Sequence, residues 1–208
     1  MGLRERKKAE TRRRIADIAT GLFMIHGFDR VTVADVARAA DVSVNTVFNY
    51  FKTKEDLFFD RQREFTERHA AAFRDRLPGE SAVMVFRRRF LDGLDQNAYY
   101  TGFHEGADVW TKTVFDSPAL MARQREMTEL AEATLAQALA EDLGADPDDV
   151  TPRIAAAMFT AAGNRLIREI LQRKAAGESL TEMRQGVYEA ANRTFDLLEQ
   201  GLGDYGAR

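Results

Sequence analysis

The sequence has no cysteine, few prolines and no long apolar run. Without cysteine the chain cannot form disulfides or zinc–thiolate sites and has no thiol nucleophile, which suits a reducing cytoplasm. No apolar segment approaches the roughly 20 residues that span a bilayer. Residues 1–14 are charged throughout and lack the apolar segment of a secretory signal. We therefore expect a soluble cytoplasmic protein without a membrane partner.

Recognisable catalytic and metal-binding motifs are also missing. The three histidines, His26, His69 and His104, lie far apart, and none belongs to a His-x-x-x-His or Glu-x-x-His pair. There is no Gly-rich phosphate loop and no Gly-x-Ser-x-Gly nucleophile elbow. We therefore expect no catalytic residues, no metal and no cofactor.

Charge is distributed unevenly along the chain. The net charge is −3, yet residues 1–54 contain 11 Lys and Arg against 6 Asp and Glu. The basic N-terminal part therefore precedes an acidic remainder. This pattern is typical of a protein in which only one part meets nucleic-acid phosphates.

Helical periodicity and the scarcity of strand-like alternation predict an all-α fold. A first helix is expected over residues 8–26, followed by two short helices that begin after the capping residues Thr32 and Ser43. A long fourth helix is expected over residues 54–77. Further helices are expected at 81–97, 103–115, 119–143, 149–176 and 180–202.

The two short helices and the tight turn between them predict a helix-turn-helix. In the segment Ser43 to Phe51, the i, i+4 pair Val47 and Phe51 should face the supporting helices. The opposite face should then enter the major groove of duplex DNA, where Asn pairs with adenine and Thr or Val contacts a thymine methyl. The predicted base-contacting residues are Val44, Asn45, Thr46 and Asn49.

Phosphate contacts are predicted around the same helix. Tyr50, Lys52 and Lys54 follow its exposed end, and Thr32 and Ser43 offer hydroxyl groups at helix N-termini. The basic N-terminal run offers further contacts to the DNA backbone, or forms a solvated arm. Its members are Arg4, Arg6, Lys7, Lys8, Arg12, Arg13 and Arg14.

The sequence resembles the TetR family of bacterial transcriptional regulators. The resemblance is carried by Ile15, Ala19, Leu22-Phe23, Gly27-Phe28, Thr32 to Ala37, Val42-Ser43 and above all by Thr46 to Leu57. Asn45 departs from the pattern, since many members have glycine or another small residue there.

The resemblance implies a domain organisation and a mode of action. Residues 1–54 would form a three-helix DNA-binding domain, and residues 55–208 a larger helical domain for ligand binding and dimerisation. A homodimer formed through the last two long helices would bind a palindromic operator as a repressor. A small-molecule effector would release it from the DNA.

Aromatic residues with a few polar neighbours indicate where an effector would bind. Ordinary core packing is the alternative for each of them, and an interface hydrogen bond is the alternative for Asn164. The predicted ligand-binding residues are Phe90, Tyr100, Phe103, His104, Trp110 and Asn164. Nearby, the side chains of Arg87, Arg88 and Arg89 cannot all point one way, so at least one should approach the body and pair with an acidic residue. Binding of an anionic ligand is the alternative for these arginines.

The sequence leaves the dimer interface and two alternative functions open. Apolar stripes within residues 155–171 and 187–202 fit a dimer interface or packing within one chain. A helical small-molecule carrier or enzyme with an incidental basic head is the alternative function. A third possible function is that of an architectural DNA-binding protein without a ligand. The acidic remainder of the chain argues against it, because negative charge repels DNA phosphates.

Overall fold

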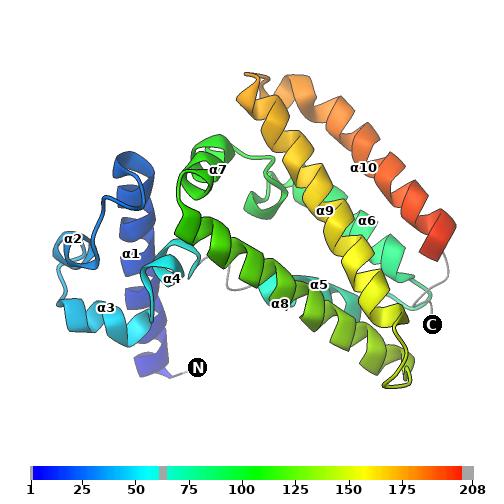
Figure 1. The fold of residues 1–208 in the computed structure, drawn as a ribbon, viewed down its shortest axis with the longest axis horizontal. Coiled ribbons are helices and arrows are strands. Elements are labelled where there is room, and N and C mark those ends of the chain that lie inside the picture. Colours follow the sequence, from blue (N-terminus) through cyan, green and yellow to red (C-terminus); the bar gives the residue numbers. More distant parts are fainter. Residues whose placement is uncertain (1, 61–64, 203–208) are drawn as a thin grey trace. The chain divides into compact units, whose positions relative to one another are not determined.

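The computed structural model describes residues 2–60 and 65–202, and these ranges contain helices and no strands (Figure 1). The predicted all-α fold is therefore confirmed. None of the described helices combines the length and the apolar character needed to cross a membrane. The elements are α1 (Leu3–His26), α2 (Val33–Ala39), α3 (Val44–Tyr50), α4 (Lys54–Phe58), α5 (Phe65–Arg74), α6 (Ala82–Asp95), the 3-10 helix η2 (Tyr99–Thr101), α7 (Ala107–Phe115), α8 (Pro118–Leu143), α9 (Thr151–Ala175) and α10 (Leu180–Leu202).

The chain packs as two compact units. Unit 1 comprises Met1–Arg63 and Val109–Arg125, and unit 2 comprises Glu64–Asp108 and Glu126–Arg208. The predicted functional boundary after residue 54 stays a prediction. As a packing unit, however, the N-terminal part also includes α4, most of α7 and the beginning of α8.

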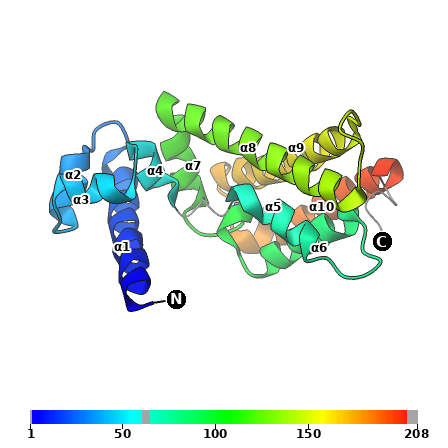
Figure 2. The same ribbon diagram turned by 90° about the horizontal axis from the view of Figure 1, so that it is seen from below.

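In unit 1, α1 supports the two short helices. Figure 2 shows α2 and α3 on one side of α1, and α1 packs against both α2 and α4. The buried residues Ile15, Phe23 and Phe28 supply much of this core. α1 ends at His26, and its C-cap is Gly27, whose positive φ of 85° favours glycine. α1, α2 and α3 thus pack as the three-helix arrangement that is expected for the N-terminal part.

The end of α4 corrects one expectation. The predicted helix over residues 54–77 is interrupted, because α4 ends at Phe58 and α5 begins at Phe65 and ends at Arg74. Phe58 and Phe59 both contact the Trp110 ring, with centroid distances of 5.5 and 6.0 Å. Successive residues of a regular helix point about 100° apart. Ending the helix here therefore lets both rings meet one partner.

Polar contacts also attach the later segments to unit 1. The Ser117 hydroxyl donates to Asp29 Oδ1 at 2.9 Å. Arg123 pairs with Asp56 at 3.1 Å. Together with the contacts of Trp110 with Phe58 and Phe59, these bonds explain why residues 109–125 belong to unit 1 and not to unit 2.

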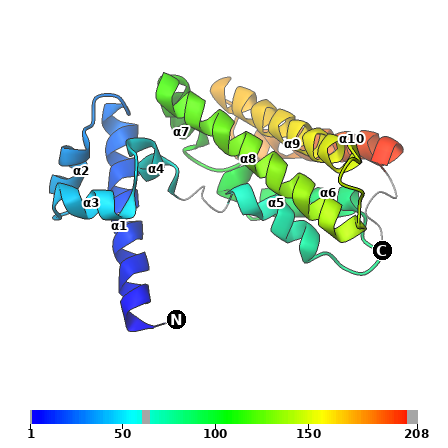
Figure 3. The ribbon, with the colours of Figure 1, turned by 60° about the horizontal axis from the view of Figure 1, so that its bottom comes forward.

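Unit 2 is organised around α6, α9 and α10. Figure 1 shows α9 and α10 side by side, and α10 also packs on α6. Figure 3 shows α5 beside α6. The predicted helix over 103–115 begins only at Ala107, because Gly102 and Gly106 adopt positive φ angles of 72° and 79°. The central core residues are Phe73, Leu94, Phe103, Leu135, Leu139, Ile170 and Met183.

Two of the three consecutive arginines on α6 form ion pairs, as predicted. Arg87 binds Asp196 at 2.6 Å and Glu199 at 3.0 Å, both on α10. Arg88 binds Glu80 at 2.7 Å. This pair lowers the pKa of Glu80 below its usual value, chiefly through the hydrogen bond from Arg88. α6 is thus tied to its neighbours by charge as well as by apolar packing.

Candidate DNA-binding surface

The helix-turn-helix is built by two capped short helices. Thr32 Oγ1 accepts a hydrogen bond from the Asp35 N–H and donates to the Asp35 carboxylate. The hydrogen bonds that the Thr32 hydroxyl and the Thr32 N–H donate to this carboxylate lower the pKa of Asp35. The turn that follows contains Asp41 at φ 52°, and the N–H of Val42 bonds back to Ala37 O at 3.0 Å. This closed turn sets the direction in which α3 leaves.

α3 has one buried face and one exposed face. Val47 and the C-cap residue Phe51 are each 1% exposed, as their spacing predicts. On the opposite side, Asn45 and Asn49 are exposed and Val44 is 38% exposed. A short helix held from behind with an open polar and apolar face is the arrangement that enters a major groove.

Thr46 is placed differently from the other three predicted base-contacting residues. It is half-buried, and its hydroxyl lies 2.8 Å from Ser43 Oγ. Ser43 Oγ also accepts the Thr46 N–H at 3.0 Å and so caps α3. The Ser43–Thr46 pair therefore stabilises the start of the helix as well as lying beside its exposed face.

Phe48 is a residue that sequence reasoning missed. It is 50% exposed, on the same side of α3 as Val44. The spacing already contained this signal, because residues four apart lie on one helical face. An exposed aromatic ring beside Val44 offers apolar contact to a thymine methyl.

The predicted phosphate-binding residues differ in their exposure and in the hydrogen bonds that they already make. Lys52 is exposed, and Tyr50 is half-buried. The Lys54 ammonium donates to Phe28 O at 2.9 Å and to Val31 O at 3.1 Å. It also lies 4.1 Å from the centroid of the Phe28 ring. Lys54 thus holds the α1–α2 connection, which sequence reasoning did not anticipate.

Arg12 also has a supporting contact. Its guanidinium pairs with Asp60 at 2.6 Å, donates to the backbone carbonyl of Tyr50 and lies 4.4 Å from the Phe51 ring centroid. It therefore fixes the end of α3 to α1. Arg13 and Arg14 are exposed on α1 and remain available for DNA phosphates.

The predicted ligand-binding residues do not all share one unit. Phe90 and Phe103 belong to the core of unit 2. In the same unit, the Arg68 guanidinium lies 4.0 Å from the Tyr100 ring centroid, and His104 Nδ1 lies 2.7 Å from Glu105 O. Asn164 is half-buried on α9. Trp110 belongs to unit 1, where it packs on Phe58 and Phe59.

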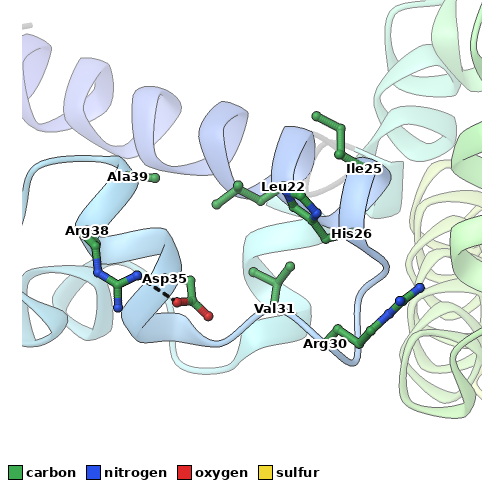
Figure 4. A pocket seen from close by; sticks show the side chains of 8 residues that line it. All are labelled: Leu22, Ile25, His26, Arg30, Val31, Asp35, Arg38 and Ala39. Atoms are coloured by element: carbon green, nitrogen blue, oxygen red, sulfur yellow. Dashed lines mark hydrogen bonds and ion pairs between the residues drawn. The ribbon is translucent and has the colours of Figure 1, made fainter.

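Unit 1 also contains a pocket that the sequence did not indicate. Its volume is about 610 Å³, and Figure 4 shows that its lining comes from the end of α1, the following connection and α2. Apolar and charged side chains are mixed in it, and none belongs to the predicted ligand set. The lining residues are Leu22, Ile25, His26, Arg30, Val31, Asp35, Arg38 and Ala39. Within residues 2–60 and 65–202, no cluster of His, Asp and Glu side chains is suited to hold a metal ion.

Two family models match most of the chain. Residues 15–60 match the bacterial regulatory proteins of the tetR family, and residues 108–202 match the MftR C-terminal domain. The first match contains α2, α3 and α4, and thus the surface described above.

Individual proteins agree with these matches. The HTH-type transcriptional regulator TcmR of Streptomyces glaucescens is 31% identical over 81% of this chain and 76% of its own length. The HTH-type transcriptional repressor Rv1474c of Mycobacterium tuberculosis is 42% identical over 37% of this chain and 42% of its own length.

A solved structure shows the same fold. NalD, the secondary repressor of the MexAB-OprM multidrug efflux pump in Pseudomonas aeruginosa, aligns with a TM-score of 0.56 at 18% identity. The alignment covers 91% of this chain and 97% of NalD. The chain therefore belongs to the TetR family of bacterial regulatory proteins, and it is a DNA-binding transcriptional regulator, not an enzyme.

Proposed function

We propose that the protein binds a palindromic operator as a homodimer and that a small-molecule effector releases it. The observation that carries the DNA-binding part is the exposed face of α3, formed by Val44, Asn45, Phe48 and Asn49. Two asparagine amides beside two apolar side chains suit adenine edges and thymine methyls. Lys52, Arg13 and Arg14 are exposed and supply charge for the phosphates.

The dimer is proposed through α9 and α10. Most of the predicted apolar stripes pack within the chain, since Phe159, Ile170 and Phe195 belong to its core. Other apolar side chains on the same helices remain exposed, with Ile154 at 51% and Leu197 at 65%. These exposed residues support an interface with a second copy. One short recognition helix reads few bases, so a pair of them is needed for selective binding.

The effector is proposed to bind in unit 2. Support comes from the aromatic and polar side chains that this unit brings together, including Phe90, Tyr100, Phe103 and Asn164. Regulators of this family bind DNA operators and small-molecule effectors. The cytoplasmic location expected from the sequence, with nucleoid association when bound to DNA, belongs to the same proposal.

The experiment compares Asn49→Ala with the wild type on a panel of duplexes by fluorescence anisotropy. Removing a bidentate base contact should cost about 1–3 kcal/mol on the preferred duplex and less on mismatched ones. Gln96→Ala is the matched control, because Gln96 is an exposed carboxamide at the C-cap of α6, outside α3 and outside the proposed interface helices α9 and α10. Equal affinities of the Asn49→Ala variant and the wild type on every duplex would refute base reading by α3.

A further inference from the structure

The pocket in unit 1 contains no residue of α3 and none of the predicted effector residues. Its volume of about 610 Å³ lies within the range of small-molecule sites. All of its lining residues lie between Leu22 and Ala39, within the N-terminal segment of unit 1. A molecule bound in this pocket therefore contacts the DNA-binding unit itself.

One part of the lining is apolar. Leu22 and Ile25 come from α1, Val31 from the connection that follows it, and Ala39 from the end of α2. Val31 is buried and Leu22 is half-buried, whereas the Ile25 side chain is 76% exposed. A hydrocarbon group in the pocket would remove apolar surface of these residues from water, which favours binding.

The charged side chains of the lining differ in how they are paired. Both oxygens of the Asp35 carboxylate are engaged, because the Thr32 N–H and hydroxyl donate to Oδ2 and Arg38 donates to Oδ1. Arg30 pairs with no carboxylate in the part of the chain that the structure describes. A Cβ atom at Gly27 would lie 3.6 Å from two nitrogens of the Arg30 guanidinium, which thus lies beside the end of α1.

The positive charge that remains unpaired is confined to one end of the pocket. Figure 4 shows Arg30 and Arg38 at opposite ends of the lining, with Leu22 and Val31 between them. Because Asp35 already neutralises Arg38, only the Arg30 end attracts an anion. The planar fork of arginine N–H donors suits a carboxylate. A matching ligand carries one negative charge at one end and an apolar body beside it.

We propose that this pocket binds an amphipathic monoanion, a small organic carboxylate whose charged end pairs with Arg30. His26 is exposed at the end of α1 and offers a ring N–H to the same carboxylate. The hydrocarbon part covers Leu22, Ile25 and Val31. The inference goes beyond the effector proposed for unit 2, because it assigns a separate ligand site to the DNA-binding unit.

Three probes separate the contributions of charge and apolar surface. They are 4-butylbenzoate, which has both, 4-butylbenzamide, which has the same shape without the charge, and acetate, which has the charge without the apolar body. Their affinities for the full chain without DNA are measured by equilibrium dialysis. Thermal unfolding of each variant shows that it is folded.

Three variants locate the site. Arg30→Gln removes the unpaired charge. Ala39→Phe places a ring in the pocket, and the fold should accept it because Ala39 is exposed. Arg125→Gln is the matched control, since Arg125 is an exposed arginine of unit 1 that lies outside the lining.

The wild type should bind 4-butylbenzoate more tightly than the other two probes. Arg30→Gln should weaken 4-butylbenzoate by about 3- to 10-fold, the range of one net hydrogen bond, and leave 4-butylbenzamide unchanged. Ala39→Phe should weaken both aromatic probes, because it fills the space that they share. Arg125→Gln should change neither.

The proposal is overturned if 4-butylbenzoate does not bind, if it binds no better than 4-butylbenzamide, or if Arg30→Gln binds it as tightly as the wild type. Binding that survives Ala39→Phe would place the probe elsewhere, for example in unit 2, and would also overturn it. Operator affinity of the same variants is measured separately. If Arg30→Gln weakened operator binding and left probe binding unchanged, Arg30 would be a phosphate contact and not part of a ligand site.

Discussion

Single side chains in unit 1 hold α3 and the α1–α2 connection in place. Lys54 bonds to two carbonyls of the α1–α2 connection, and Arg12 joins α1 to the end of α3. Both residues are cations in a DNA-binding domain, so the sequence suggests phosphate contacts for them. The structure shows that a cation near the recognition helix also serves the fold when unpaired carbonyls lie within its reach.

Lys54→Met separates these two roles. The variant should lower the free energy of unfolding by about 1–3 kcal/mol, because two buried carbonyls lose a charged donor. Lys52→Met should leave unfolding unchanged, since Lys52 is exposed. Urea denaturation measures both. A Lys54→Met variant of wild-type stability would mean that its two carbonyl bonds do not stabilise unit 1.

His69 makes the stability of unit 2 depend on pH. Its pKa falls from 6.5 to about 4 on folding, because burial disfavours the charged ring. Below about pH 6.5 the unfolded chain therefore takes up a proton that the folded chain does not. As the pH falls from 6.5 to 4, the free energy of unfolding of the wild type should decrease by about 3 kcal/mol through this group.

The measurement is urea unfolding at pH 7 and pH 4 for the wild type and His69→Gln. The variant should lose about 3 kcal/mol less than the wild type over this interval. His26→Gln serves as a control, since His26 is exposed. Parallel losses in the wild type and His69→Gln would contradict a neutral, buried His69.

At the scale of elements, α3 depends on its cap. The helix has seven residues, too few to be stable alone, and Ser43 supplies the side-chain bond at its start. Ser43→Ala should destabilise unit 1 by about 1 kcal/mol and weaken operator binding. Ser81→Ala removes the corresponding cap of α6 and should cost similar stability without weakening DNA binding. Unchanged operator affinity in Ser43→Ala would contradict the account.

Much of the helical pattern was predictable, because apolar spacing and caps are local signals. Thr32, Ser43 and Gly27 mark element ends in the structure as they do in the sequence. The interruption after Phe58 was not predictable, since it depends on contacts with Trp110, which lies far along the chain. The bonds from Lys54 to two backbone carbonyls were likewise not predictable, because pairing depends on geometry and not on residue type.

At the scale of the whole molecule, the exposed apolar residues of α9 and α10 should form the dimer interface. Ile154→Glu places a charge in that interface and should shift the protein from dimer to monomer at micromolar concentration. Operator affinity should fall with it. Leu130→Glu is the control, because Leu130 is 58% exposed on α8. Sedimentation velocity is the measurement, and a dimeric Ile154→Glu protein would exclude this interface.

The central claim is that α3 reads duplex DNA within a two-fold symmetric dimer. Selection of bound duplexes from a random pool, with the intact wild-type protein, tests it most directly. The account predicts an enriched palindrome whose half-sites lie about 34–36 Å apart, or a multiple of that, and whose sequence preference is relaxed in Asn49→Ala. A pool without sequence enrichment, or an enriched site unaffected by Asn49→Ala, would contradict it.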